Sequence, residues 1–215
     1  MHFFFTSLPR NVVSVFRRRY LLYHVLAIAS TICIVYSGLD WAYFVDTKSL
    51  YPYFFGAVIL GGLLPLLLPP MLIGLGHARK NIELTGLGWV LWQSAFVGWL
   101  VSSTYKAFTG RIQPDLYNYV TDISHGFQFG FLRHGIFWGW PSSHTTVAFS
   151  MAVTFVTLYP GKRALGALWL LYAFLIGLGV SMSIHWLSDA VAGVLIGTVC
   201  GLAVGKGYQR AQKLG

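Results

Sequence analysis

Six long apolar runs constrain this sequence more than any other feature. They cover about residues 20–38, 54–76, 84–104, 143–159, 164–184 and 187–204. Each is close to the roughly 20 residues that an α-helix needs to cross the hydrocarbon core of a bilayer. Hydrophobic residues make up 56% of the chain and charged residues only 10%, whereas a soluble domain carries about 25% charged residues. The sequence therefore predicts an all-α, polytopic membrane protein with six transmembrane helices.

A basic and aromatic segment, residues 1–19, precedes the first run and contains Phe3 to Phe5, Arg10 and Arg17 to Arg19. This composition predicts an amphipathic helix on an anionic membrane face. The alternative is the positive region of a signal peptide, but signal peptides have apolar regions of roughly 7–15 residues, shorter than the run at 20–38. We therefore expect a basic segment at 1–19, followed by one six-helix membrane domain at 20–215.

The second run and the stretch before it carry local signals of their own. Residues 40–53 contain Asp40, Asp46 and Lys48 and are expected to form a polar loop. Pro65, Pro69 and Pro70 lie inside the second run and predict a kink or a broken helix end, because proline lacks the backbone N–H that a helix interior uses.

The basic residues divide unequally between the two expected sides of the membrane. All but four of the 15 lysines and arginines fall at the termini or in the short turns near residues 77–81 and 161–163. The four others are Lys48, Lys106, Arg111 and Arg133. By the positive-inside rule, both termini are cytoplasmic in the cytoplasmic (inner) membrane, and the long loop 105–140 faces the periplasm or exterior.

The same topology explains the net charge of +9 without a nucleic-acid partner, and no nucleic-acid-binding motif is present. Cys33 and Cys200 both fall in apolar runs and are expected to be free thiols. The sequence leaves the oligomeric state open.

Three polar clusters are predicted to meet at the outer face. The first, from Lys106 to Asp115, includes Arg111 and Gln113. The second is Pro141-Ser142-Ser143-His144, at the start of the fourth span. The third pairs His185 with Asp189, whose spacing of i, i+4 places both on one helical face.

Each cluster has a structural and a chemical interpretation. Lys106 and Arg111 are either interfacial anchors or a phosphate clamp of a point charge and a bidentate fork. Ser142 and Ser143 either cap a helix or bind phosphate oxygens together with the N–H groups of the helix start. His185 and Asp189 either hold two helices together or form an oriented nucleophile, and function is the default for ionisable groups in a span.

Two histidines, an orienting aspartate, cations and hydroxyls at one membrane face favour phosphoryl transfer through a phosphohistidine. In this interpretation no metal or other cofactor is required. The candidate catalytic residues are His185, His144 and Asp189. The candidate substrate-binding residues are Lys106, Arg111, Gln113, Ser142, Ser143 and Arg133.

These residues resemble the type 2 phosphatidic acid phosphatase superfamily, whose pattern is K-x6-R-P, then P-S-G-H, then S-R-x5-H-x3-D. The matching positions are Lys106, Pro114, Pro141, Ser142, His144, His185 and Asp189. The resemblance implies that His185 attacks phosphorus while Asp189 orients it. It also implies that His144 protonates the leaving oxygen, that Lys106 and Ser142 bind the phosphate, and that no metal takes part.

The sequence departs from the family pattern at both motif arginines. Gln113 occupies the first arginine position, and Gly179 occupies the second with Leu178 at the adjacent serine position. Losing a charge-assisted donor weakens binding of a developing phosphoryl charge. Either Arg111 or Arg133 replaces the missing guanidinium, with Arg111 the better placed, or Gln113 marks an altered substrate geometry. A third alternative is a degraded enzyme that binds lipid phosphate without turnover.

The implied function is an integral membrane phosphatase that hydrolyses a lipid phosphomonoester or pyrophosphate. Substrates implied by the resemblance are undecaprenyl pyrophosphate, phosphatidylglycerophosphate, phosphatidic acid and lipid A phosphate. The aromatic residues at 127–140 are either a lid over lipid entry or an ordinary interfacial belt. Alternatives are a phosphotransferase that uses the same phosphohistidine and a non-catalytic lipid-phosphate binder. A channel is disfavoured because the polar residues gather at one face.

Overall fold

The computed structural model describes residues 2–117 and 120–213, with side chains from residue 4 onward. All regular elements in these ranges are helical, which confirms the all-α prediction. The α-helices are α1 His2–Val15, α2 Leu21–Tyr36, α3 Leu39–Thr47, α4 Tyr51–Ala78, α5 Ile82–Thr109, α6 Ser143–Leu158, α7 Arg163–Ser181 and α8 Leu187–Gln212. Short 3-10 turns at Arg18–Tyr20 and Lys48–Leu50 join α1 to α2 and α3 to α4.

Five helical stretches are long and apolar enough to cross a membrane. They are Arg18–Tyr36, Leu39–Ala78, Ile82–Thr109, Arg163–Ser181 and Leu187–Gln212. Helix α6 has 16 residues, about 24 Å at 1.5 Å per residue, which is shorter than a hydrocarbon core of about 30 Å. The structure thus supports a multi-pass membrane protein, and the sixth span stays a prediction.

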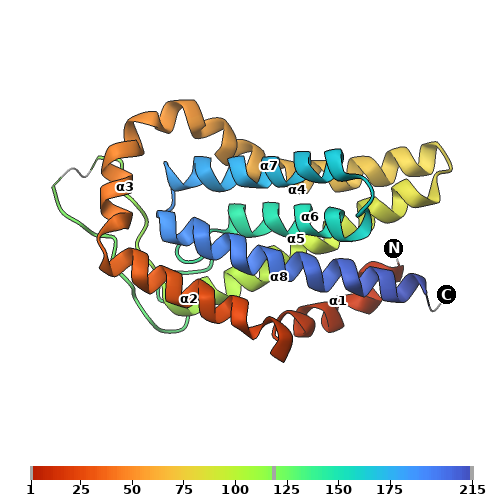
Figure 1. The fold of residues 1–215 in the computed structure, drawn as a ribbon, viewed down its shortest axis with the longest axis horizontal. Coiled ribbons are helices and arrows are strands. Elements are labelled where there is room, and N and C mark those ends of the chain that lie inside the picture. The colour runs from red at the N-terminus through yellow and green to blue at the C-terminus, as the bar shows by residue number, and fades with distance from the viewer. Residues whose placement is uncertain (1, 118–119, 214–215) are drawn as a thin grey trace.

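Helix α6 lies at the centre of the bundle, packed between α5, α7 and α8 (Figure 1). Its contact with α8 is close, because a Cβ added to Gly197 or Gly201 would lie 2.5 or 2.6 Å from an α6 carbonyl oxygen. Its contact with α5 is polar, since the Ser94 hydroxyl lies 2.7 Å from those of Ser150 and Thr154. Small and hydroxyl-bearing residues are what membrane helices use for close packing.

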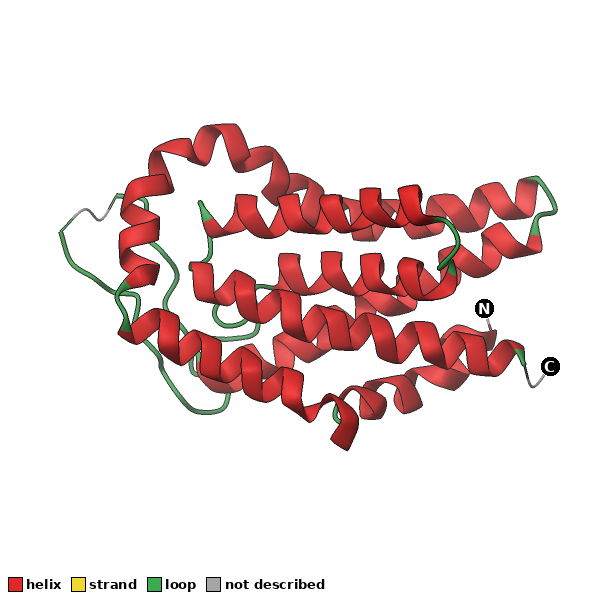
Figure 2. Ribbon diagram, in the orientation of Figure 1, coloured by secondary structure: helices red, strands yellow, loops and turns green. Residues whose placement is uncertain are grey.

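The two ends of the bundle differ in what they carry. Both termini lie at one end, together with the α4–α5 and α6–α7 turns (Figure 1). The long connection between α5 and α6 lies at the other end, beside the α7–α8 turn, and forms loops and turns in its described part (Figure 2). This arrangement brings the three predicted polar clusters to the same end.

The stretch expected as a polar loop at 40–53 is instead largely helical. Gly38 ends α2 with a left-handed φ of +74°, and α3 then begins at Leu39. Asp40 and Phe44, one helical turn apart, are both buried. The loop prediction was wrong because it considered the polar residues without their spacing. Helix α4 continues through Pro65, Pro69 and Pro70, and its first part curves visibly in Figure 1.

Helix α1 packs against α5 and α8. Ser7, Asn11 and Ser14 are buried on it. The Asn11 amide donates to Gln93 Oε1 (2.7 Å), and the Gln93 amide donates to the Phe4 carbonyl (2.5 Å). The polar face of α1 therefore turns toward the bundle. The expected contact of the 1–19 segment with an anionic membrane face stays a prediction.

Candidate active site

The start of α6 supplies the first half of the site. Ser142 is its N-cap, and the Ser142 hydroxyl accepts from Thr145 N–H (3.4 Å) and from the Thr145 hydroxyl (3.1 Å). A side-chain oxygen at this position satisfies an N–H group that has no partner within the helix. The cap places Ser143 and His144 in the first turn. The Ser143 hydroxyl lies 2.9 Å from that of Ser102 on α5.

The turn between α7 and α8 supplies the second half. The His185 N–H donates to the Val180 carbonyl at the end of α7 (3.0 Å). His185 Nδ1 lies 3.2 Å from Asp189 Oδ2, and the same oxygen accepts from Trp186 N–H (3.2 Å). A proton on Nδ1 directed at this carboxylate leaves Nε2 with its lone pair. The predicted pair is therefore formed, with the unprotonated nitrogen available for attack. The two residues do not share a helical face as expected, because His185 precedes α8, which begins at Leu187.

The two helix starts are joined directly. The Ser142 N–H donates to the Asp189 carbonyl (3.1 Å). The rings of His144 and His185 face the same space, with their centroids 6.3 Å apart. His185 is 3% exposed, and burial lowers its pKa because the charged imidazolium loses its hydration. A largely neutral, oriented imidazole beside a second imidazole can act as nucleophile and acid.

These groups open into a cavity of about 520 Å³. Its polar end is formed by Lys106, Ser143, His144 and His185. Its walls are apolar and come from α4, α5, α6, the loop before α6 and the α7–α8 turn. They comprise Gly61, Gly62, Pro65, Leu66, Trp92, Ala95, Phe96, Trp99, Ile136, Phe137, Trp138, Val147 and Ile184. The volume lies in the usual range of 300–1,000 Å³ for a small-molecule site.

Lys106 is the single lysine or arginine among the described residues that line this pocket. Its side chain is 2% exposed, and its ammonium group donates to the Phe137 carbonyl (3.0 Å). An ammonium group has three N–H donors. Lys106 is therefore placed to offer the remaining donors and its charge to an anion beside His185.

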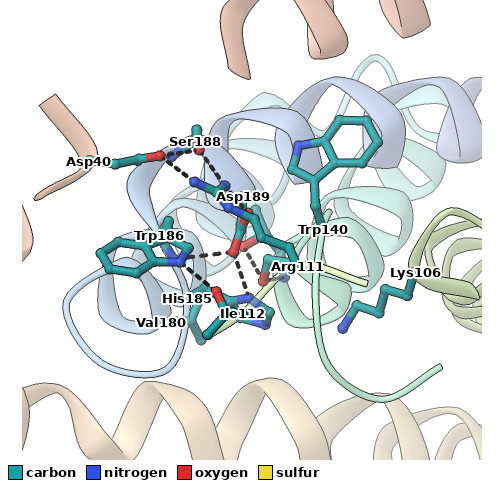
Figure 3. A network of polar contacts seen from close by, with 12 residues as sticks. Asp40, Lys106, Arg111, Ile112, Trp140, Val180, His185, Trp186, Ser188 and Asp189 are labelled. Atoms are coloured by element: carbon teal, nitrogen blue, oxygen red, sulfur yellow. Dashed lines mark hydrogen bonds and ion pairs between the residues drawn. The ribbon is translucent and has the colours of Figure 1, made fainter. Parts of the chain in front are cut away.

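Arg111 does not line the pocket but lies behind Asp189 (Figure 3). Its Nη1 donates to Asp189 Oδ1 (2.5 Å) and Ser188 Oγ (2.7 Å), and its Nη2 donates to Asp40 Oδ2 (2.7 Å). Nη2 and Nε both donate to a single carbonyl of the α5–α6 connection, at 2.7 and 3.2 Å. The guanidinium is 0% exposed and each of its five N–H groups has an acceptor.

The expectation that Arg111 clamps the phosphate is therefore corrected by its position. The guanidinium has no donor directed at the pocket, because two carboxylates, the Ser188 hydroxyl and a carbonyl accept all of its N–H groups. Ser142 caps α6 with its hydroxyl and is not among the residues that line the pocket, so its role as a phosphate ligand stays a prediction. Backbone N–H groups of the first turn and Ser143 remain as neutral donors at the pocket.

The structure also shows where the other residues related to the two missing motif arginines lie. Gln113 lies beside the α7–α8 turn, where its amide oxygen accepts from Gly139 N–H (2.9 Å) and its amide nitrogen donates to the Ile184 carbonyl. Arg133 is exposed in the loop, outside the pocket lining. A side chain at Gly179 would collide with α4, since an added Cβ would lie 2.3 Å from Ala57 Cβ. The fold thus fills the space that a motif arginine at 179 would need.

Asp40 is a site residue that the sequence analysis missed. Its carboxylate accepts from Ser188 N–H (2.8 Å), the Ser188 hydroxyl (2.6 Å) and Arg111. It is 0% exposed although it lies in α3, 71 residues before Arg111 in the chain. A signal was present, because Asp40 is one of six acidic residues and directly follows the first apolar run. The spacing gave no hint of its partner.

A profile of the PAP2 superfamily matches residues 86–213. The matched region contains both histidines, Asp189 and Lys106, and thus every polar group of the pocket. The comparisons with curated proteins and with solved structures found no match. Because the profile covers more than half of the chain, this protein belongs to the PAP2 superfamily.

Proposed function

We propose that this protein is a membrane phosphatase that hydrolyses a lipid phosphomonoester or pyrophosphate through a phosphohistidine at His185. Membership of the PAP2 superfamily indicates phosphatase-type activity on lipid phosphates. The observation that carries the finer proposal is His185, held through Nδ1 by Asp189 at 3.2 Å while its ring lines the pocket beside His144 and Lys106.

The reaction proceeds in two displacements. In the first, the lone pair of His185 Nε2 forms a bond to phosphorus, and the bond from phosphorus to the lipid oxygen breaks. His144 donates its proton to that leaving oxygen. In the second, water loses a proton to His144 and attacks phosphorus, the N–P bond breaks, and inorganic phosphate leaves. Lys106 and the first-turn N–H groups of α6 stabilise the charge on the transferred group.

The shape of the pocket supports a lipid rather than a soluble phosphate. Its walls between α4 and α5 are apolar from His144 down to Trp92 and Leu66. Trp92 and Lys106 are 14 residues apart on α5, so the groove extends about 21 Å along that helix at 1.5 Å per residue. An acyl or isoprenoid chain fits this groove while its phosphate lies at the polar end.

The test is phosphate release from a panel of lipid phosphates in detergent containing EDTA. Wild type is compared with His185→Ala and with His125→Ala, a matched control in the exposed part of the loop. We expect release that survives EDTA, persists in His125→Ala and falls by at least about a hundredfold in His185→Ala. Full activity in His185→Ala contradicts the phosphohistidine. A phosphorylated acceptor formed in place of free phosphate indicates a transferase.

The pH dependence gives a second test of the nucleophile. Because burial lowers the pKa of His185 below its ordinary 6.5, the neutral, attacking form persists to lower pH than in an exposed histidine. We expect the acidic limb of kcat/KM to lie below pH 6.5, measured with a substrate whose own ionisation is subtracted. An acidic limb above 6.5 contradicts the assignment.

The proposed orientation places the site at the outer face of the cytoplasmic membrane, with both termini inside. The arrangement in Figure 1 supports this, because the basic turns and the termini lie opposite the loop that covers the site. A membrane-impermeant maleimide should label Phe129→Cys in intact cells, and should label Lys80→Cys only after permeabilisation. The reverse pattern contradicts the orientation.

A further inference from the structure

The rear of the catalytic histidine carries a buried charge cluster, the Arg111 network, formed by Asp40, Arg111, Ser188 and Asp189. Arg111 lies between the two carboxylates, at 2.7 Å from Asp40 and 2.5 Å from Asp189. All three charged side chains are 0% exposed. Buried charges are costly unless they are paired and hydrogen-bonded, and this cluster meets both conditions.

The formal charges of the cluster determine the electrostatic potential at His185. An isolated pair of Arg111 and Asp189 has no net charge, so the guanidinium would cancel the carboxylate that faces His185. Asp40 adds a second negative charge on the far side of Arg111. The three groups together then carry a net charge of −1, on the side of the ring opposite the substrate.

This net charge matters because attack makes the imidazole positive. When Nε2 forms its bond to phosphorus, the ring retains the Nδ1 proton and becomes a phosphorylated imidazolium. A negative cluster behind Nδ1 stabilises that charge, whereas a neutral one does so much less. The other charged or titratable groups that line the pocket around the ring are Lys106 from α5 and His144 from α6. The pocket-lining residues of α4, and Ile184 in the α7–α8 turn, are uncharged.

We propose that Asp40 is a positioning residue of the reaction, which balances Arg111 so that Asp189 presents net negative charge to His185. The inference rests on the phosphohistidine function proposed above. Asp40 reaches the site by a second route as well, because it accepts from Ser188 N–H and Oγ in the first turn of α8. The N-cap of that helix, Trp186, has no side-chain oxygen. Asp40 therefore supplies the acceptor from another helix.

The experiment uses a charge series in the full-length protein. Asp40→Asn makes the network neutral, Arg111→Gln makes it −2, and the double variant restores −1. Asp46→Asn is the matched control, because Asp46 is exposed on the same helix. Ser188→Ala removes a hydrogen bond to Asp40 without changing charge.

The first readout is the pH dependence of kcat and KM on a lipid phosphate. We expect Asp40→Asn to move the acidic midpoint down by about half a pH unit or more and Arg111→Gln to move it up. The double variant, Ser188→Ala and Asp46→Asn should stay near the wild-type midpoint. In Asp40→Asn, kcat should fall about tenfold while KM changes little, since Asp40 does not touch the pocket.

The second readout does not depend on turnover. Diethyl pyrocarbonate acylates neutral imidazole, so the pH midpoint of His185 modification, followed by mass spectrometry of its peptide, should show the same signs. If no variant and no wild type hydrolyses lipid phosphate but the midpoints shift as expected, the proposed function fails and the charge role stands.

If wild type is active and Asp40→Asn and Arg111→Gln shift the midpoint in the same direction, or not at all, the charge role is wrong. A purely structural role predicts that result, because damage to packing does not depend on whether the substitution makes the network more or less negative. Should Asp40→Asn fail to fold, Arg111→Gln and the double variant still test whether the pH midpoint rises when the network becomes more negative.

Discussion

The imidazole of His185 lies between two regions whose cations differ in how many of their hydrogen-bond donors are already used. In front of it lies a pocket with apolar walls, where Lys106 is the single lysine or arginine among the described lining residues. Behind it lies the Arg111 network, in which every guanidinium N–H group has an acceptor. The front retains donors for a substrate, and the rear has none left. A cation near the proposed catalytic histidine can therefore stabilise the protein instead of binding the substrate.

The same contrast appears in how the two helices at the site begin. Helix α6 is capped by its own Ser142, a local signal that is visible in sequence. Helix α8 takes an acceptor from Asp40, 148 residues earlier in the chain. The start of α8 therefore combines a local cap, in which Asp189 accepts from Trp186 N–H, with an acceptor from a distant helix. Variants of Asp40 should affect the rear region more than the pocket.

The largest expected effect comes from breaking the rear region with Arg111→Ala. This change leaves Asp40 and Asp189 buried without their shared cation, which should cost about 3–5 kcal/mol of stability and lower turnover. Thermal inactivation in detergent and phosphate release measure the two effects. Arg133→Ala, an exposed position, should change either by little. Equal losses of stability and phosphate release in the two variants would show that the buried network contributes no more than an exposed arginine does.

A large effect on activity alone is expected from Lys106→Met in the front region. Removing the ammonium group should lower kcat by about 10²–10³, the range for losing one donor to a developing charge. Thermal stability should not fall, because the variant no longer buries a charge. A destabilised Lys106→Met with normal kcat would mean that Lys106 belongs with the structural charges of the rear.

A smaller effect should follow from narrowing the apolar groove with Leu66→Trp. Leu66 lines the groove, whereas its neighbour Leu67 does not, and their exposures are similar at 64% and 61%. We expect Leu66→Trp to raise KM for a long-chain lipid phosphate about tenfold and to leave a short-chain soluble phosphate ester unaffected. Leu67→Trp should change neither. An equal effect on both substrates would indicate damage to the polar end of the site.

The smallest expected effect distinguishes two adjacent serines. Ser142→Ala removes the cap of α6 and should cost about 1 kcal/mol, read as a lower melting temperature. Ser143→Ala removes a hydroxyl at the pocket and should lower activity at nearly unchanged stability. If both serines affected only activity, Ser142 would be a phosphate ligand as the sequence motif implies.

Much of the fold was predictable because its signals are local. The apolar runs predicted α2, α4, α5, α7 and α8 within a few residues, apart from the longer ends of α4, α5 and α8. The errors lie in segments whose secondary structure does not follow from the length of an apolar run. The stretch at 40–53 was taken for a loop because it is polar, although one face of α3 is buried.

The candidate site was predictable to the same degree. The contact of His185 with Asp189 was predicted from their i, i+4 spacing, but it forms across the start of α8, because His185 lies in the turn before that helix. Chemical type alone assigned Arg111 to the substrate, since a guanidinium suits phosphate as well as it suits a carboxylate. The choice depends on which acceptors lie within reach, and one of them, Asp40, comes from a distant helix.

The sequence by itself determined that this chain is a multi-pass, all-helical PAP2 protein, because apolar length and motif spacing are properties of short segments. The tertiary structure decided which side of His185 each cation serves. It placed Lys106 in the pocket, Arg111 between two carboxylates, and α4 in the space that an arginine at 179 would fill. These outcomes depend on contacts between helices far apart in the chain, and no local pattern specifies such contacts.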